Sequence, residues 1–534
     1  MTSEAFPTID LSKYDQLTEG SATILFPKNK VFYNHVQQYN RDLSCLAIRA
    51  FTELYQEEKV LLRRKRNKQP VTDGAQPSTE DVTETLTKAD AEEKAKKQPY
   101  AIVMEALSAS GLRAIRYAKE IPLIKSIIAN DLSAAAVDSI NVNIQHNQVG
   151  NKVTSNHADA IQYMSQHKDE YHVIDLDPYG SAAPFLDSAM QAVKNGGMML
   201  ITCTDMGVLA GNGYPEKCFA LYGGSNVGGD ATHETALRLV LNMIATTGAK
   251  YRKSIEPLLC LSIDFYVRLF IRVHQSPIKV KELAYNTMMM SKCSGCYSVT
   301  EQRLGKISHN KNGSKKFGLA TGASHIGPNC SFCGYVNHIG GPMWAGNLHN
   351  KDFIDRVLSL QAKADDKIYK TLPRIKGMLT MAKNELDAHF YFKPTSVSSV
   401  LKIPAPSIET FTGALGNLGY HASLSHTVPN SIKTDAPWET IWFIGKKLAE
   451  KCKLDKSKLS ETTAGYKILS NDDVGKDIDL NKLKAESGST DMEDSDWLFQ
   501  RNEVSDQVNQ LRRIKIVRFQ ENPTKNWGPK SRPK

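Results

Sequence analysis

An acidic turn follows a short apolar segment in the first half of the chain. Asp177, Pro178, Tyr179 and Gly180 come directly after residues 172–176 (His-Val-Ile-Asp-Leu), a pattern that predicts a buried strand of a parallel sheet. Because proline has no N–H, this turn offers a carboxylate and a carbonyl as hydrogen-bond acceptors beside an aromatic ring. Such a set suits a planar substrate that carries an amino group. In the alternative interpretation, Asp177 only caps the following helix.

Two further acids follow predicted strands earlier in the chain. Asp131 comes twenty residues after Gly111 (131 − 111), which ends the small-residue turn Ser-Ala-Ser-Gly. This spacing is typical of an acid that binds ribose hydroxyls. Asp159 and Ala160 follow the next predicted strand and are expected to hold an adenine, with the Asp accepting its amino group. Each of these acids could instead be a helix cap.

The glycine content of the first turn separates two cofactor classes. Residues 108–111 contain one glycine, whereas a dinucleotide pyrophosphate is usually bound by a G-x-G-x-x-G turn. S-adenosylmethionine has no pyrophosphate, so the sequence favours this methyl donor over a nicotinamide dinucleotide.

Alternating strands and helices are expected to position these residues. The predicted strands are 101–107, 127–131, 153–157, 172–176, 197–203, 257–263 and 267–273, and the predicted helices are 112–119, 134–146, 161–166, 188–194 and 231–246. The alternation predicts an α/β, Rossmann-like doubly wound sheet, with antiparallel pairing of the last two strands as one possibility. In such sheets ligands bind at the carboxyl ends of the strands, where the acids and the turn lie.

Four cysteines form two C-x-x-C pairs, Cys293 with Cys296 and Cys330 with Cys333. Paired knuckles of this kind predict a zinc site with four thiolates. A site closed by four protein ligands has no open position for catalysis, so the zinc would be structural. Two redox pairs, or thiols without a ligand, are the alternative.

Composition bounds the remaining possibilities. The chain has 534 residues, 41% of them hydrophobic and 23% charged, and a formal net charge of +10. No apolar run approaches the ~18 residues of a membrane span. The first twenty residues contain four acids and no apolar core segment, which argues against a secretory signal or mitochondrial presequence at this start site. The five unpaired cysteines (9 − 4) indicate a reducing compartment.

Three segments differ from the rest. Residues 56–98 are basic and then polar, and we expect a disordered insertion whose basic cluster is either a nuclear localisation signal, a nucleic-acid contact or solvated charge. Residues 455–495 are polar and acid-rich, which predicts a loop. Residues 511–534 are a basic tail interleaved with Phe519 and Trp527, which suits an RNA backbone, as does the basic stretch 303–316.

Longer motifs resemble the eukaryotic tRNA (guanine-26-N2)-dimethyltransferases, and a yeast-like member in particular. They lie at 105–116, 129–132, 175–180, 202–205, 211–224, 341–346 and 522–530. The resemblance implies an S-adenosylmethionine-dependent methyltransferase domain over residues 1–277. A smaller, zinc-containing α+β domain that binds tRNA would follow over residues 278–534.

The resemblance also implies roles for single residues. The cofactor contacts would be Arg41, Arg113, Asp131, Asp159 and Ala160. The catalytic group would be Asp177, Pro178 and Tyr179, with Phe32 as a second aromatic facing the base. The implied reaction transfers two methyl groups from S-adenosylmethionine to N2 of guanosine 26 in tRNA. We expect the protein to be a monomer. The basic cluster and the resemblance point to the nucleus, and the resemblance alone adds the mitochondrion.

Three other functions remain to be weighed against this one. The chain could be a tRNA-binding or tRNA-folding module with weak or no catalysis. It could also be an amino-methyltransferase that acts on another nucleic acid or on protein. A nicotinamide dehydrogenase is disfavoured because the three-glycine turn is absent.

Overall fold

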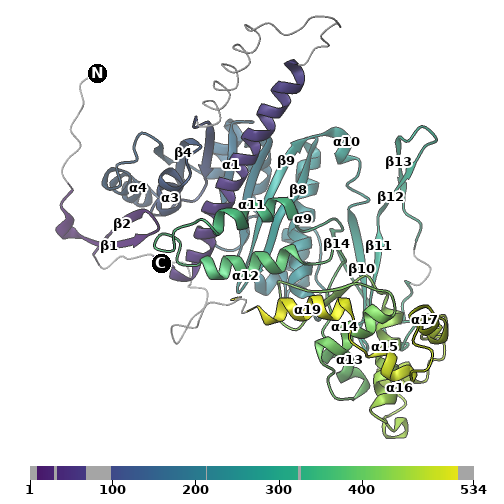
Figure 1. Cartoon of the computed structure of the whole chain (residues 1–534). Helices are drawn as coiled ribbons and strands as arrows, with labels where there is room; N and C mark the ends of the chain where they lie inside the picture. The colour runs from purple at the N-terminus through teal and green to yellow at the C-terminus, as the bar shows by residue number, and fades with distance from the viewer. Residues whose placement is uncertain are drawn as a thin grey trace, which may run out of the picture.

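A seven-stranded sheet organises the first half of the molecule (Figure 1). The computed structural model describes residues 9–28, 33–67, 98–211, 213–322, 326–514 and 517, without the side chains of 63–67. The strands are β3 (Ala101–Glu105), β4 (Ile124–Asp131), β5 (Val153–His157), β6 (Tyr171–Leu176), β7 (Val193–Cys203), β8 (Lys253–Ile263) and β9 (Tyr266–Gln275). Their order is β5-β4-β3-β6-β7-β9-β8; β9 pairs antiparallel with both β7 and β8, and the other neighbouring strands pair in parallel. The predicted doubly wound α/β sheet is confirmed.

The chain changes direction across the sheet between β3 and β6. It runs outward from β3 to β4 and β5, and then returns to place β6 on the other side of β3. Glu105 of β3 pairs in register with Asp175 of β6. The turns after these two strands therefore emerge side by side at the carboxyl edge, the usual ligand position of an open α/β sheet.

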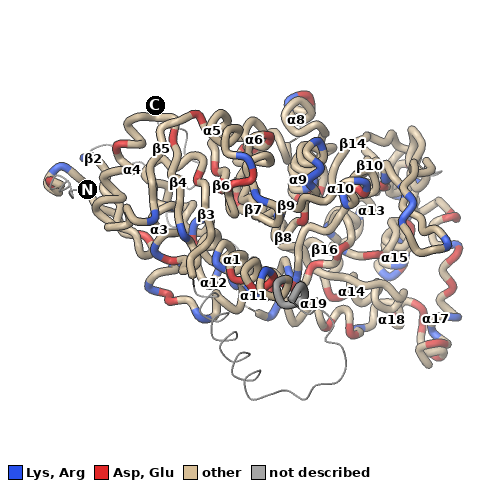
Figure 2. The backbone as a smooth tube through the Cα atoms, turned by 90° about the horizontal axis from the view of Figure 1, so that it is seen from above, with Lys and Arg blue, Asp and Glu red and all other residues tan. Residues whose placement is uncertain are grey.

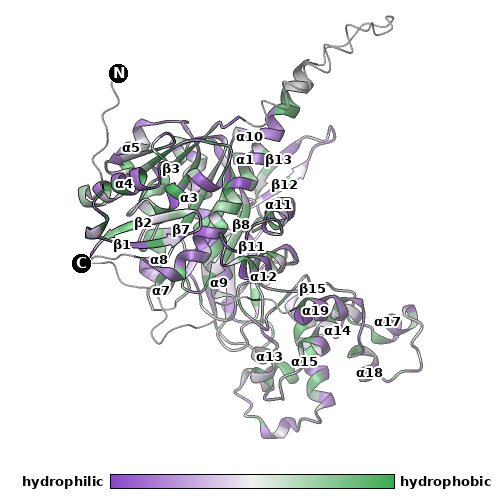
Figure 3. Cartoon of the chain, turned by 60° about the vertical axis from the view of Figure 1, so that its left-hand side comes forward, coloured by the Kyte–Doolittle hydropathy of each residue, from purple (hydrophilic) through white to green (hydrophobic). Residues whose placement is uncertain are grey.

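Helices cover both faces of the sheet, and apolar residues concentrate on its strands (Figure 3). They are α3 (Leu112–Glu120), α4 (Ala134–His146), α5 (Ala160–Gln166), α6 (Leu186–Ala192) and α9 (Thr232–Lys250). Helix α6 starts and ends two residues before the predicted 188–194, and β7 starts at Val193 rather than at 197. Gly196 takes a left-handed conformation (φ 78°), which lets β7 continue through an irregular start next to β6.

Helix α1 (Gln38–Asn67) extends into the segment that was predicted to be disordered. The prediction of disorder from residue 56 was wrong for residues 56–67, because acids in this part of the helix pair with two arginines of the folded body. Glu58 accepts from Arg272, and Glu57 accepts from Arg356 at 2.7 Å. Residues 68–97 of the predicted insertion lie outside the described residues.

The C-terminal half adds a second, smaller sheet and many short helices. Its strands are β10 (Thr287–Cys293), β11 (Val299–Arg303) and β14 (Asn337–Trp344), with two separate hairpins formed by β12 (Gly305–His309) with β13 (Lys315–Leu319) and β15 (Ala422–Leu424) with β16 (Ile432–Thr434). Its helices are α11 (Lys351–Gln361), α12 (Leu372–Lys383), α13 (Pro394–Leu401), α14 (Ile408–Asn417), α15 (Trp438–Lys451), α16 (Ala464–Leu469), α17 (Leu480–Glu486), α18 (Asp494–Leu498) and α19 (Glu503–Arg513). Lysine, arginine and acidic residues are interspersed along this half and the first (Figure 2).

Two expectations for this half need revision. The loop prediction for 455–495 was wrong, because α16 and α17 are capped by Thr463 and Asp479 and bury Ile468 and Leu480. Helices α11 and α12 follow residue 277, yet they pack in one core with α1 and the large sheet.

None of the helices in the described parts of the chain has the length and apolarity needed to cross a membrane.

Strand β8 lies at the edge of the large sheet, and the C-terminal half covers its outward groups. The Leu258 carbonyl accepts from the Asn350 N–H at 2.9 Å. The N–H of Cys260 donates to Nδ1 of His349 at 3.4 Å, and that of Ser262 donates to Nε2 of His426 at 3.2 Å. Because these ring nitrogens accept, the imidazole protons lie on the opposite nitrogens.

Those opposite nitrogens face one buried carboxylate, Glu385. His426 Nδ1 is 2.9 Å and His349 Nε2 is 3.4 Å from its oxygens, and the ammonium of Lys433 is 3.6 Å away. The carboxylate of Glu385 thus already accepts from the backbone N–H and the imidazole of His426, with the His349 ring and the Lys433 ammonium beside it. The cluster is therefore a structural clamp on β8 rather than a metal centre.

A buried ion cluster joins the N-terminal hairpin, formed by β1 (Tyr14–Glu19) and β2 (Ala22–Pro27), to α1 and α3. Arg116 lies 2.7 Å from Glu19, 2.7 Å from Asp42 and 2.9 Å from Glu120. Burial raises the pKa of Glu19, but Arg41 and Arg116 outweigh it and lower the pKa to about 2. Arg116 therefore neutralises acids on three elements at once.

We expect Arg116→Met to destabilise the fold by about 3–5 kcal/mol, because it leaves buried carboxylates without their common partner. Urea unfolding followed by circular dichroism measures this. Arg49→Met removes the partly exposed pair with Glu53 and is the control, with an expected change within about 1 kcal/mol. Equal effects of both substitutions would show that the buried cluster contributes no more than a surface pair.

Candidate active site

The turn after β3 forms one side of the candidate site. Ala109 (φ 50°) and Gly111 (φ 77°) take left-handed conformations, and the Gly111 N–H donates to the Ser108 carbonyl at 2.8 Å. Glu105 lies beneath this turn, where it accepts from the Ser108 hydroxyl at 2.7 Å and the Ala114 N–H at 3.2 Å. The tight turn brings backbone N–H groups to the carboxyl edge of the sheet.

Asp131 lies against that turn. One carboxylate oxygen accepts from the Ala109 N–H and the other from the Ser133 N–H, both at 2.9 Å. Each carboxylate oxygen has a second lone pair, so Asp131 can still accept from two ribose hydroxyls.

Asp159 and Ala160 begin α5 at the next strand end. Asp159 accepts from the Ile161 N–H at 2.7 Å and the Gln162 N–H at 3.4 Å, and Ala160 is buried. Asp159 is therefore a helix cap, as the alternative interpretation held. Its predicted adenine contact would add to that role.

The acceptor turn after β6 is held rigidly. The Gly180 N–H donates to the Thr204 hydroxyl, and the Thr204 N–H donates to the Gly180 carbonyl, both at 2.8 Å. Pro178 is buried between these contacts and the strand, while Tyr179 is 53% exposed. An aromatic side chain thus stands at the surface beside two fixed acceptors.

Arg113 joins the two turns. Its guanidinium forms an ion pair with Asp177 and lies 3.8 Å from Asp175. The structure thus brings a predicted cofactor residue together with the predicted catalytic acid.

A buried network supports the acceptor turn from below. Asp175 accepts from the Tyr117 hydroxyl at 2.6 Å and from Arg268 at 2.9 Å. Arg268 also donates to the hydroxyls of Thr202 and Ser44, both at 2.8 Å. Burial raises the pKa of Asp175, but Arg268 and Arg113 outweigh it and lower the pKa. The sequence analysis missed this network, although Arg268, between apolar residues of the strand 267–273, was a signal for it.

Arg41 and Phe32 are the two remaining predicted residues. Arg41 is buried, donates to Glu19 at 2.7 Å and to the Asn34 carbonyl at 3.0 Å, and makes no hydrogen bond to Asp131 or Asp159 in the part of the chain that the structure describes. Phe32 lies outside the described residues.

The chain also has a clear set of known relatives. Residues 13–446 match the family model of the N2,N2-dimethylguanosine tRNA methyltransferases. The chain belongs to this family. It is 46% identical to the mitochondrial tRNA (guanine(26)-N(2))-dimethyltransferase of Saccharomyces cerevisiae, over 100% of this chain and 94% of the relative. It is 38% identical to the human tRNA (guanine(26)-N(2))-dimethyltransferase, over 97% of this chain and 77% of the relative.

A solved structure of similar fold is Trm1 from Pyrococcus horikoshii in complex with S-adenosyl-L-methionine. The two chains share 26% identity with a TM-score of 0.60, over 80% of this chain and 99% of that one. The likeness confirms that this N2,N2-dimethylguanosine tRNA methyltransferase family member has the α/β fold of an S-adenosylmethionine-dependent methyltransferase.

The four cysteines of this family member come together in one buried cluster. The Sγ atoms of Cys293 and Cys333 are 3.4 Å apart, and those of Cys296 and Cys330 are 3.6 Å apart. Both distances exceed the ~2.05 Å of a disulfide and approach the ~3.8 Å between thiolates around tetrahedral zinc. The close pairs join one knuckle to the other, which favours a single shared metal over two redox pairs.

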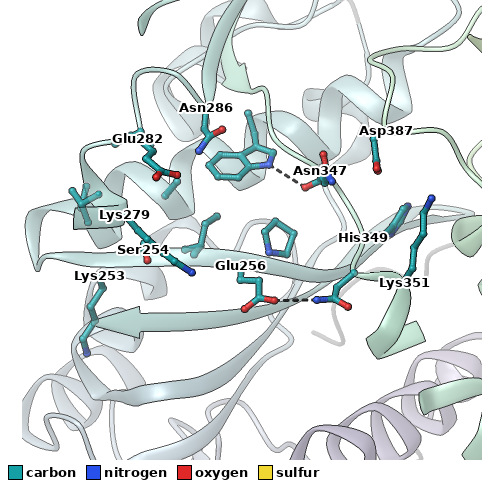
Figure 4. Close-up of a pocket in the computed structure, with 18 of the residues that line it drawn as sticks. Lys253, Ser254, Glu256, Lys279, Glu282, Asn286, Asn347, His349, Lys351 and Asp387 are labelled. Atoms are coloured by element: carbon teal, nitrogen blue, oxygen red, sulfur yellow. Dashed lines mark hydrogen bonds between the residues drawn. The ribbon is translucent and has the colours of Figure 1, made fainter. Parts of the chain in front are cut away.

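A cavity of about 510 Å³ lies where β8 begins, at the edge of the large sheet opposite the carboxyl edge that carries the acceptor turn (Figure 4). Trp344 and Pro257 line it together with Glu256, whose carboxylate accepts from Asn350 at 3.0 Å. Lys253, at its border, is engaged by Asp169 at 2.8 Å. The strands separate this cavity from the acceptor turn, so it is not the candidate methyl-transfer site of this methyltransferase family member.

We expect Glu105→Gln to change how stability depends on pH. Burial raises the pKa of Glu105 to about 8, from an ordinary value near 4.5. Between these values the folded state binds a proton that the unfolded state has released, so the wild type loses stability as pH rises from about 5 to about 8. The glutamine variant cannot ionise, and its thermal midpoint should fall less over this range. Parallel curves for the two proteins would contradict a protonated Glu105.

Proposed function

We propose that the chain transfers two methyl groups from S-adenosylmethionine to the exocyclic N2 of guanosine 26 in tRNA. Family membership over residues 13–446 supports this reaction. The observation that carries it to particular residues is the acceptor turn 177–180, fixed at the carboxyl edge beside the turn after β3.

The cofactor would lie along the carboxyl ends of β3, β4 and β5. Asp131 would hold the ribose hydroxyls, and Asp159 with Ala160 would hold the adenine. Arg113 would complete the contacts to the cofactor. Arg41 would contribute through the N-terminal hairpin, which it joins to α1. When bound, S-adenosylmethionine supplies an electrophilic methyl group on a sulfonium that is a good leaving group.

The acceptor turn addresses the weak nucleophilicity of the guanine amine. The N2 lone pair is delocalised into the purine ring, so the amine must be drawn toward tetrahedral geometry. Asp177 would accept one N–H and the Pro178 carbonyl the other, which localises the lone pair. Asp177 would then take the proton that leaves nitrogen.

The target base has to leave the RNA stack before it can reach this turn, which costs a few kcal/mol. Tyr179 would stack on one face of the purine and Phe32 on the other, at ~1–3 kcal/mol per stacked base. After the first transfer one N–H remains, so one acceptor loses its partner. The site must therefore accommodate the first methyl group and still align the second transfer.

The C-terminal half would bind the body of the tRNA. Its zinc, held by Cys293, Cys296, Cys330 and Cys333, would be structural. The basic stretch 303–316 and the tail 511–534 would contact phosphates, although the tail lies almost entirely outside the described residues. We place the protein in the nucleus and the mitochondrion, as a monomer.

Asp177→Asn should abolish dimethylation while S-adenosylmethionine binding stays near the wild-type value. The amide is nearly isosteric, but it cannot take a proton and presents donors to the amine. Nucleoside analysis of unmodified tRNA after reaction measures N2,N2-dimethylguanosine, and calorimetry measures cofactor affinity. Asp138→Asn, exposed on α4, is the control. Wild-type protein that binds tRNA without methylating it would instead indicate a binding module.

Cys330→Ser should remove about one zinc ion per chain, measured by mass spectrometry of protein purified without chelators. It should also lower the thermal midpoint, because a structural zinc stabilises only the folded state. Cys452→Ser, at an exposed single cysteine, should change neither quantity. Wild-type protein with no bound zinc would exclude the metal site.

A further inference from the structure

Residues 204–225 form a strap across the carboxyl edge, immediately beside the acceptor turn. The strap contains α7 (Met206–Leu209) and α8 (Pro215–Tyr222), and residue 212 within it lies outside the described residues. It starts at Thr204, whose two hydrogen bonds to Gly180 connect it directly to the turn. Figure 3 shows both helices at the lower edge of the large sheet.

The strap is fixed in the middle and at its end. The Tyr222 hydroxyl donates to Asp205 at 2.6 Å. Ser225 and Gly341 exchange two backbone hydrogen bonds, at 3.2 and 2.9 Å. A Cβ on Gly224 would lie 2.4 Å from the Pro342 carbonyl oxygen, so only glycine allows this close approach. These contacts hold α8 at a defined place beside the site.

Helix α8 exposes aromatic and apolar side chains although it is well anchored. Its buried residues are Cys218 and Tyr222. Tyr214, Phe219 and Leu221 are 49%, 56% and 41% exposed, close to the value for Tyr179 in the adjoining turn. Three exposed large side chains on one short helix and its N-cap make this segment a candidate interaction site.

Charge on the helix narrows the class of partner. The Lys217 ammonium lies 4.3 Å from the centroid of the Tyr214 ring, which pairs a cation with an aromatic face. Glu216 is also exposed and adds a negative charge to the helix, so the helix is not a general basic patch. Aromatic faces with a single cation suit unstacked nucleotides, which stack on rings and bring one phosphate each.

We propose that Tyr214 and Phe219 are a stacking platform for the nucleotides that flank the target guanosine, with Lys217 on the adjoining phosphate. The inference rests on the proposed function. A base that leaves the RNA stack leaves its neighbours without a stacking partner, and the platform provides one beside the acceptor turn. Tyr214 and Phe219 are therefore positioning residues for the target base.

The test uses the full chain and unmodified tRNA. Tyr214→Ala and Phe219→Ala should each raise KM for tRNA by roughly 5- to 150-fold, the range for loss of one stacked base. S-adenosylmethionine affinity and the thermal midpoint should not change. Tyr214→Phe should retain the wild-type KM. Lys217→Ala should lower the slope of log affinity against log salt by about one.

Two further variants sharpen the comparison. Ile278→Ala truncates a side chain that is 69% exposed at the opposite edge of the sheet, and it should behave as wild type. Tyr214→Trp keeps a stacking surface and adds a reporter, whose fluorescence tRNA should quench beyond the quenching seen in the wild type.

The outcomes separate this inference from the proposed function. If wild-type protein forms N2,N2-dimethylguanosine and the alanine variants match Ile278→Ala, the platform is wrong and the function stands. If the wild type forms none, the proposed function fails first. If the alanine variants change the oligomeric state of the protein in solution but not KM for tRNA, the exposed side chains of α8 bind a second copy of the chain instead.

Discussion

A buried carboxylate at the centre of the sheet has to be neutralised, and the architecture of the active edge depends on how this is done. Asp175 lies directly beneath the acceptor turn, with no access to water, between Arg268 on one side and Arg113 on the other. Two guanidinium groups around one carboxylate leave a net positive charge. Asp177 takes up that excess through Arg113, so the proposed catalytic acid and the structural acid belong to one ionic system.

The same system connects elements that are far apart in the chain. Arg268 of β9 and Tyr117 of α3 both donate to Asp175 near the end of β6, and Arg268 also donates to Ser44 of α1. The second sheet is attached by a similar device. Arg238 of α9 donates to the carbonyls of Trp344 and Gly346, both at 3.0 Å, where β14 ends. Buried arginines with backbone and carboxylate partners thus join the methyltransferase sheet to the half of the chain that carries the cysteines.

The alternation of strands and helices and the position of Asp131, Asp159 and Asp177 at strand ends were predictable, because period-2 and period-3.6 patterns with acids at strand ends are local signals. The cysteine cluster was predictable from spacing alone. Contacts between distant segments were not: the continuation of α1 to Asn67 depends on Arg272 and Arg356, which follow it by hundreds of residues. The helices within 455–495 were not predicted for another reason. Each is held by one cap and one or two buried side chains, which leave little hydrophobic pattern in the sequence.

The clamp on β8 has a consequence for the evolution of the chain. The edge of an open sheet is a template on which another strand can pair, and exposed edges promote association between molecules. Here that template is covered by His349, Asn350 and His426, all supplied by the C-terminal half, and Pro257 removes a further donor from the same strand. Without the rest of the chain, the methyltransferase sheet would therefore expose the edge of β8 and tend to associate with other molecules. This constraint favours inheritance of the two halves as one unit, whatever each of them does for the reaction.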